Sequence, residues 1–201
     1  MRILLAGEGK TELGEWSKEA PHRDDPGEKG VLAALLERIL GAPPEIAYAV
    51  KWSRIRKYRA GGRATAEERN VLGLGLVARR ERCEAVVFSR DRDGDQERQR
   101  DLEEGLTRAR EAFAEIGFVG GVAIENIEGW LLVLCGRDGE RVPRSRTKSE
   151  LEAQFSISSL EHKVDAVARA RLDLVPAGSL ASWIENARAV FDVATSTATS
   201  T

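Results

Sequence analysis

Short apolar runs alternate with longer stretches of helical periodicity up to about residue 135 of the chain. The runs at residues 2–6, 46–50, 85–88 and 119–124 have the length and the apolar, β-branched content of buried strands. Between them, apolar residues recur every three or four positions, as in the helix predicted over residues 102–116. Strand and helix thus alternate four times, which predicts an α/β fold with a parallel sheet of about four strands, flanked by helices on both faces.

The pattern changes after Gly136, where helical periodicity continues over residues 160–172 and 179–191 without further strands. The last seven residues, 195–201, are only Ser, Thr and Ala. We therefore expect an α/β domain over residues 1–136, a helical extension packed on it over 137–194, and a disordered tail over 195–201. The polar stretch 13–30, which contains Pro21, Pro26 and Gly27, predicts a long loop or a broken helix.

Composition narrows the class of protein further. The chain has 201 residues, of which 42% are hydrophobic and 32% are charged, which is typical of a globular protein with its own core. Its apolar stretches are too short to cross a bilayer and its N-terminus lacks a secretory signal pattern, so we expect a cytoplasmic protein without membrane contact. Since there are only two cysteines and two histidines, a catalytic centre would rest on carboxylates.

Acidic residues follow three of the four predicted strands. In a parallel sheet the carboxyl ends of the strands lie at one edge, so we expect these side chains to meet there. Carboxylate oxygens are preferred ligands of Mg²⁺ and suit Mn²⁺, which predicts a divalent metal site at this edge. The candidate ligands are Glu8 after the first strand, Asp91, Asp93 and Asp95 after the third, and Glu128 after the fourth, with Glu125 close to it.

Each acidic motif also has an ordinary structural explanation. Glu8 could match the charge of a helix N-terminus, and residues 91–95 could be a polar turn that opens a helix. Glu8 lies between Gly7 and Gly9, however, which allows a close approach of the backbone to a ligand. The convergence of three acidic clusters favours the metal site over the separate explanations.

This combination of motifs resembles the Toprim domain, which occurs in topoisomerases, primases, small nucleases and nucleases of the overcoming-lysogenization-defect type. Over residues 1–135 it is most similar to a bacterial Toprim-related branch with E-G-x-T-E, D-x-D and I-E-x-W-L-L motifs. The matching segments are Glu8-Gly9-Lys10-Thr11-Glu12, Asp91-Arg92-Asp93-Gly94 and Ile127-Glu128-Gly129-Trp130-Leu131-Leu132.

The resemblance implies a Mg²⁺-dependent (or Mn²⁺-dependent) nuclease-like phosphodiester hydrolase that acts on nucleic acid, in a bacterial defence system. Glu8 would be a general acid/base or a carboxylate that organises the metal, Asp91 and Asp93 would coordinate the ion, and Glu128 would be an additional ligand or support one. The alternative is a non-catalytic Toprim-like module that binds nucleic acid or regulates a partner such as an ATPase.

A basic segment without acids follows the second predicted strand. It could hold a phosphate backbone while Trp52 and Tyr58 stack on bases, or it could be a solvated loop whose long side chains cover apolar surface. The net charge of −2 means that binding to DNA or RNA has to come from such a local patch. The candidate nucleic-acid contacts are Arg54, Arg56, Lys57, Arg59 and Arg63 of this segment, with Lys10 and Arg92 beside the acids.

Overall fold

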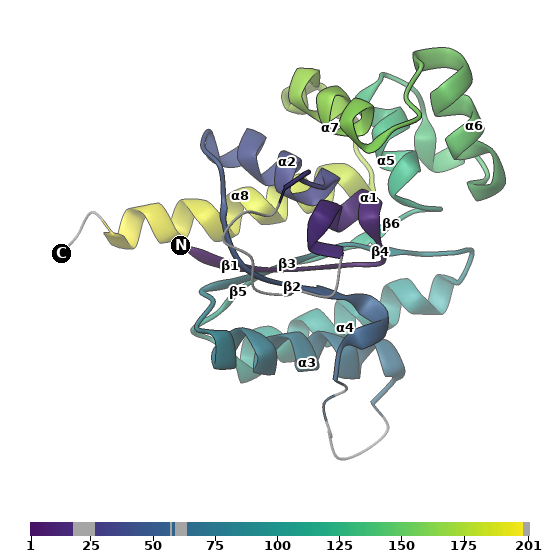
Figure 1. Cartoon of the computed structure of the whole chain (residues 1–201). Helices are drawn as coiled ribbons and strands as arrows, with labels where there is room; N and C mark the ends of the chain where they lie inside the picture. The colour runs from purple at the N-terminus through teal and green to yellow at the C-terminus, as the bar shows by residue number, and fades with distance from the viewer. Residues whose placement is uncertain (18–26, 57, 59–63, 199–201) are drawn as a thin grey trace.

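The centre of the protein is a four-stranded parallel sheet. The computed structural model describes residues 1–17, 27–56, 58 and 64–198, with side chains up to residue 191. Strands β1 (Arg2–Gly7), β2 (Glu45–Lys51), β3 (Ala85–Phe88) and β5 (Gly117–Val119) lie in the order β2-β1-β3-β5, and every neighbouring pair is parallel (Figure 1). The α/β class and the four-stranded parallel sheet predicted from the sequence are confirmed.

Two further short strands, which follow β3 and β5 in the chain, form a separate two-stranded sheet. Strand β4 (Arg90–Asp91) pairs in parallel with β6 (Val122–Ala123), so that Asp91 lies opposite Ala123. The single strand expected over residues 119–124 is therefore two strands, separated at Gly120 and Gly121. A side chain at position 120 would overlap the ring of Phe88, so glycine lets the chain pass closely over this ring.

Both faces of the sheet are buried, as the continuous apolar composition of its strands requires. Alternate residues of β1 point to opposite sides, since Ile3 and Leu5 belong to one hydrophobic cluster and Leu4 and Ala6 to another. Helices α3 (Ala66–Glu81) and α4 (Gln96–Ala112) cover the second side, while α2 (Val31–Leu40) and α8 (Ser179–Ala198) cover the first (Figure 1).

The remaining helices gather near the end of the sheet where β4 and β6 lie. They are α1 (Lys10–Leu13), α5 (Ile127–Leu134), α6 (Arg144–Phe155) and α7 (Leu160–Arg169) (Figure 1). Short 3₁₀ turns η1 (Gly14–Ser17), η2 (Trp52–Arg54), η3 (Gly139–Arg141) and η4 (Leu172–Leu174) connect the elements. Among the described residues, no helix has the length and apolar character needed to cross a membrane.

The helical extension shares the core of the α/β part. Trp183 of α8 is buried against Trp130 of α5, with 5.8 Å between the ring centroids, and its Nε1–H donates to the carbonyl of Phe88 at 2.9 Å. Helix α8 continues to Ala198, beyond the expected start of the tail at Thr195, and residues 199–201 lie outside the described part. The loop predicted over residues 13–30 begins with the end of α1 and with η1, and its segment 18–26 is also outside.

Candidate functional site

Three of the predicted acidic segments meet at the carboxyl edge of the sheet. Glu8 follows β1, Asp91 ends β4, and α5 begins after β6. The backbone N–H of Asp91 donates to Glu8 Oε1 at 3.1 Å, and the N–H of Ile127 donates to Asp91 Oδ1 at 3.0 Å. Asp91 thus connects the end of the first strand with the first turn of α5, which also carries Glu128.

Asp91 is buried among other acids. Its exposed fraction is 8%, and burial is the main cause that raises the pKa of its carboxyl group to about 7. The negative charges of Glu12, Asp93 and Glu128 raise it further, while the hydrogen bond from Ile127 acts in the opposite direction. Negative charge therefore accumulates around Asp91, as expected of a place that receives a cation.

Glu12 is a member of this cluster that the sequence reasoning did not assign to the site. Its side chain is 4% exposed, and its Oε2 accepts the N–H of Gly9 at 3.0 Å. Burial raises the pKa of the Glu12 carboxyl. The close return of α1 over the strand end depends on Gly7, since a Cβ there would lie 2.6 Å from the Cβ of Glu12. The signal in the sequence that could have identified Glu12 is its place as the last residue of the E-G-x-T-E motif.

Lys163 of α7 brings a positive charge from the helical extension into the site. Its ammonium group donates to Glu128 Oε1 at 2.6 Å and to Thr11 Oγ1 at 3.1 Å, and only 7% of the residue is exposed. In the sequence this lysine lies four residues before the buried Val167, on the same helical face. The position of a lysine on an otherwise apolar helical face is the local sequence signal that could have identified Lys163.

Arginines also pair with carboxylates of the site. Arg90 contacts Glu8 Oε1, and its Nε lies 3.3 Å from Glu67 Oε1. The guanidinium of Arg98 donates to Asp93 Oδ2 at 2.7 Å and to the carbonyl of Asp91 at 2.8 Å. These two arginines share Glu67 as a partner, because the Nε of Arg98 is also 3.3 Å from its Oε1.

A second group of charges involves Glu125 and the start of α6. Arg92 donates to Glu125 Oε1 at 3.0 Å, and the backbone N–H of Arg144 donates to its Oε2 at 3.3 Å. The guanidinium of Arg144 contacts Asp93 Oδ1. Arg92, predicted as a nucleic-acid contact, is therefore paired with an acid of the site.

Two residues of the site have a left-handed backbone conformation. Asp93 has a φ of 57° and Glu125 a φ of 66°, although neither is a glycine. Such conformations cost free energy in residues with a side chain and are frequent at functional sites. The two residues that have this unfavourable backbone conformation are also the two whose carboxylates contact Arg144.

The other predicted site residues have different surroundings. Asp95 caps α4, because its Oδ1 accepts the N–H groups of residues 97 and 98, and it is exposed. Lys10 pairs with Glu28 at 2.8 Å and not with the acids around Asp91. Arg54 and Arg56 are exposed at the end of β2, while Lys57, Arg59 and Arg63 lie outside the described residues.

The basic segment nevertheless borders the acidic cluster. The Nε1–H of Trp52, at its start, donates to Glu67 Oε2 at 2.8 Å, and the guanidinium of Arg90 lies 5.8 Å from the centre of the Trp52 ring. The segment therefore leaves the sheet on the same edge as the acids, as its position after β2 predicts.

The donor atoms of the cluster suit a hard divalent cation, but the side chains are arranged around the arginines and Lys163. Within the described ranges of the chain, no group of three acidic, cysteine or histidine side chains stands in a position to hold a metal ion. The interacting set has seven carboxyl groups and five basic groups, so it carries a formal excess of two negative charges when all are ionised. The acids are Glu8, Glu12, Glu67, Asp91, Asp93, Glu125 and Glu128, and the bases are Arg90, Arg92, Arg98, Arg144 and Lys163.

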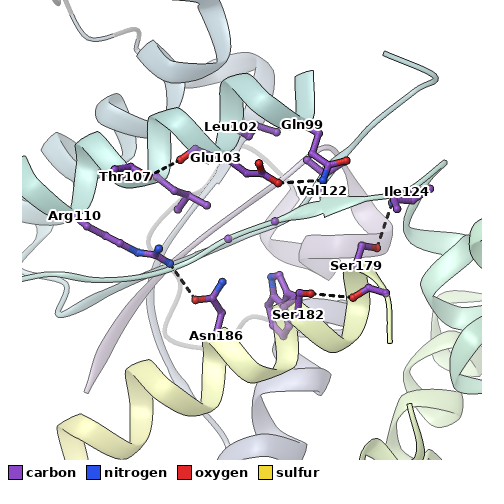
Figure 2. A pocket seen from close by; sticks show the side chains of 15 residues that line it. Gln99, Leu102, Glu103, Thr107, Arg110, Val122, Ile124, Ser179, Ser182 and Asn186 are labelled. Carbon is purple, nitrogen blue, oxygen red and sulfur yellow. Dashed lines mark hydrogen bonds between the residues drawn. The ribbon is translucent and has the colours of Figure 1, made fainter. Parts of the chain in front are cut away.

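A separate hollow of about 480 Å³ lies between α4 and α8, with the edge formed by residues 120–122 and Ile124 between them (Figure 2). Arg110 closes one end of it by donating to Asn186 Oδ1 and to the carbonyl of Phe118, each at 3.1 Å. None of the charged residues around Asp91 lines this hollow. The candidate chemistry therefore lies on the other side of β6.

Fold and site together define an α/β protein with a cluster of carboxylates and arginines at the carboxyl edge of a parallel sheet. Comparison of the chain with protein-family models, with curated proteins and with solved structures finds no match in any of the three. The function is therefore inferred from the site itself.

Proposed function

We propose that this protein is a divalent-metal-dependent phosphodiester hydrolase that acts on nucleic acid. The observation that carries the proposal is the gathering of acids from separate strand ends around Asp91, whose carboxyl pKa is raised to about 7 by burial and by the neighbouring carboxylates. A divalent cation would relieve both causes, since it replaces the water that a buried carboxylate lacks as a partner and neutralises the charges that repel one another. The Toprim resemblance predicts the same class of reaction.

Asp91 and Asp93, with Glu8 and Glu128, would hold Mg²⁺ or Mn²⁺ after a rearrangement of the site. As they stand, no three acidic side chains among the described residues are in position to hold an ion, because basic side chains pair with Glu8, Asp93 and Glu128. When bound, such an ion stabilises the negative charge that develops on a non-bridging phosphate oxygen. Asp95 is left out of this ligand set, because its carboxylate already caps α4.

Glu8 is suited to move the proton of the attacking water. Arg90 and the N–H of Asp91 both contact its Oε1, and these partners fix the position of the carboxylate at the end of β1. Its side chain is 29% exposed, so water and substrate reach it more easily than they reach Asp91. Lys163, fixed by Glu128 and Thr11, supplies a positive charge toward a phosphate.

A polymeric substrate is supported by the segment after β2. Arg54 and Arg56 are exposed, and Trp52 connects their segment to the cluster through Glu67. Exposed arginines of this kind bind phosphates. The stacking on bases predicted for Trp52 is wrong, because its ring is 5% exposed and packs against Phe88. A cytoplasmic location and a role in bacterial defence belong to the same proposal, and the latter rests on the resemblance alone.

The proposal is tested by cleavage of labelled single- and double-stranded DNA and RNA with Mg²⁺ or Mn²⁺. Asp93→Asn keeps the size of the side chain but removes a ligand charge, so we expect cleavage to fall by about 10²-fold or more. Asp95→Asn is the matched control, because Asn caps a helix as well as Asp and cleavage should persist. Full activity of the Asp93→Asn protein would rule out the assignment.

A binding or regulatory module is the second candidate. It is favoured by the pairing of Glu8, Asp93 and Glu128 with basic side chains, which balances much of the cluster's charge within the protein. Such a module would work with a partner such as an ATPase. It would bind Mn²⁺ or an oligonucleotide and cut neither DNA nor RNA with any of several divalent cations.

A further inference from the structure

Arg144 is the most accessible of the arginines that face the acidic cluster. It is the first residue of α6, and its side chain is 54% exposed, whereas those of Arg90 and Arg98 are 14% and 17% exposed. Among the described residues, the ion-pair partner of its guanidinium is Asp93 alone. Its backbone N–H is anchored separately, on Glu125. The side chain can therefore leave Asp93 while the start of the helix stays in place.

Asp93 has more cationic neighbours than one carboxylate needs. Arg98 donates to its Oδ2 at 2.7 Å, Arg144 contacts its Oδ1, and the Nη1 of Arg90 lies 3.9 Å from Oδ2. Arg90 and Arg98 also have Glu67 as a partner, so they remain paired if they lose Asp93. The oxygen that Arg144 contacts is thus the one that a competing cation can take with the least rearrangement.

A guanidinium and a divalent cation compete for the same carboxylate oxygen, because like charges repel at such short range. We propose that Arg144 is a displaceable counter-ion of the site. It neutralises Asp93 when no divalent cation is bound, and it leaves Asp93 when the cation enters. This inference rests on the proposed function, since it takes Asp93 as a ligand of the ion.

In this arrangement the helical extension sets the affinity of the site for metal. Arg144 is a positioning residue, because it holds Asp93 without belonging to the ligand set. Its charge lowers the affinity of the site for a cation, so Arg144 stays paired with Asp93 when the metal concentration is low. An arginine at the start of α6 that did not contact Asp93 would have a weaker effect.

The test is Mn²⁺ binding, measured by calorimetry at constant pH and low salt, without any substrate. Arg144→Ala removes the competing charge and keeps the backbone bond to Glu125, so its Mn²⁺ dissociation constant should be about two- to tenfold lower than that of the wild type. Arg144→Lys keeps a competing charge and should stay closer to the wild type. Arg146→Ala, on the same helix, removes an exposed arginine paired with Glu150 and should bind Mn²⁺ like the wild type.

The possible results separate the inference from the proposed function. Equal or weaker Mn²⁺ binding by Arg144→Ala, with clear binding by the wild type, overturns the role of Arg144 and leaves the metal site standing. Failure of the wild type and of all three variants to bind Mn²⁺ overturns the proposed function, and the inference with it. If Arg146→Ala tightened Mn²⁺ binding to the same extent as Arg144→Ala, the change would come from the net charge of the protein, and the inference would also be overturned.

Discussion

Asp91 is the carboxyl group around which the other charges of the site are arranged. It accepts the N–H of Ile127 and so fixes the start of α5, but the same position buries it among Glu12, Asp93 and Glu128. A residue chosen for stability alone would be uncharged here, because an ionised group in such surroundings is disfavoured. The residue thus stands where function and stability oppose each other.

Replacement of Asp91 by Asn should stabilise the metal-free protein at neutral pH. Because the pKa is raised to about 7, the folded protein keeps a proton that the unfolded chain loses near pH 4, so wild-type stability falls as the pH rises through this window. Asn carries no charge and still accepts the N–H of Ile127. Between pH 5 and pH 8, the stability of Asp91→Asn should gain roughly 1–3 kcal/mol relative to the wild type.

Urea denaturation at the two pH values, with a chelator present, measures this difference. Asp138→Asn, at an exposed position away from the cluster, is the control and should follow the wild type. Parallel pH profiles of wild type and Asp91→Asn would contradict the assigned environment of Asp91.

Lys163 and Glu128 form a largely buried ion pair, with 8% and 15% of their side chains exposed. Lys163→Met leaves the Glu128 carboxylate without its partner, and we expect the free energy of unfolding to fall by about 3–5 kcal/mol. The double variant with Glu128→Gln should recover much of this loss, because no charge then remains unpaired. A double-mutant cycle by chemical denaturation measures the coupling, and strictly additive losses would argue against the pair.

Helix α3 shows how local sequence sets the bounds of an element. Thr65 and Glu68 form a reciprocal capping box, with the N–H of Glu68 3.3 Å from Thr65 Oγ1 and the N–H of Thr65 2.7 Å from Glu68 Oε2. At the other end the helix stops at Glu81, and Arg82 caps it with a φ of 54°. Arg82 therefore ends the helix before Cys83.

Arg82→Gly should stabilise the protein, because glycine adopts the left-handed conformation of a helix C-cap without steric cost. Arg82 is exposed, so little packing is lost, and the expected gain is about 0.5–1 kcal/mol. Thermal denaturation of Arg82→Gly and Arg82→Ala separates the effect of backbone conformation from the effect of losing the positive charge. Only the glycine should raise the melting temperature, and an equal rise for alanine would assign the effect to loss of charge.

The described part of the protein has two hydrophobic clusters, one on each face of the sheet. The cluster on the side of α2 includes Trp183, Ile184 and Phe191 of α8 together with Ile3 and Val87 of the sheet. The boundary at residue 136 therefore marks a change in sequence pattern, and the core continues across it. The extension also supplies Lys163 and Arg144, so both the stability and the site depend on it.

A chain ended at residue 136 should consequently lose its cooperative fold, since one face of the sheet would lose α8 and the core side chains that this helix supplies. We expect a broad, non-cooperative urea transition and a weak near-ultraviolet circular dichroism signal. A chain ended at residue 194 keeps all the described side chains of α8 and should unfold cooperatively like the full chain. Cooperative unfolding of the shorter chain would show that the α/β part folds independently.

The order of strands and helices could be predicted because it depends on local patterns. A buried strand such as β3 is a short apolar run, and a helix such as α4 repeats its apolar residues at helical spacing, so neither requires knowledge of distant residues. The convergence of Glu8 and Asp91 followed from the same reasoning, since parallel strands end at one edge. The split of the last strand into β5 and β6 was missed, because it depends on contact with Phe88.

The partners of the acids could not be read from local pattern. Lys163 reaches Glu128 across 35 residues and Thr11 across 152, and Arg144 meets Asp93 only because α6 begins beside Glu125. Such pairs depend on how the helices pack against one another. Many different packings share the same apolar periodicity, so the periodicity does not specify which charged residues meet. Local pattern therefore placed the carboxylates at one edge of the sheet, and the packing of the helices determined which positive charges lie next to them.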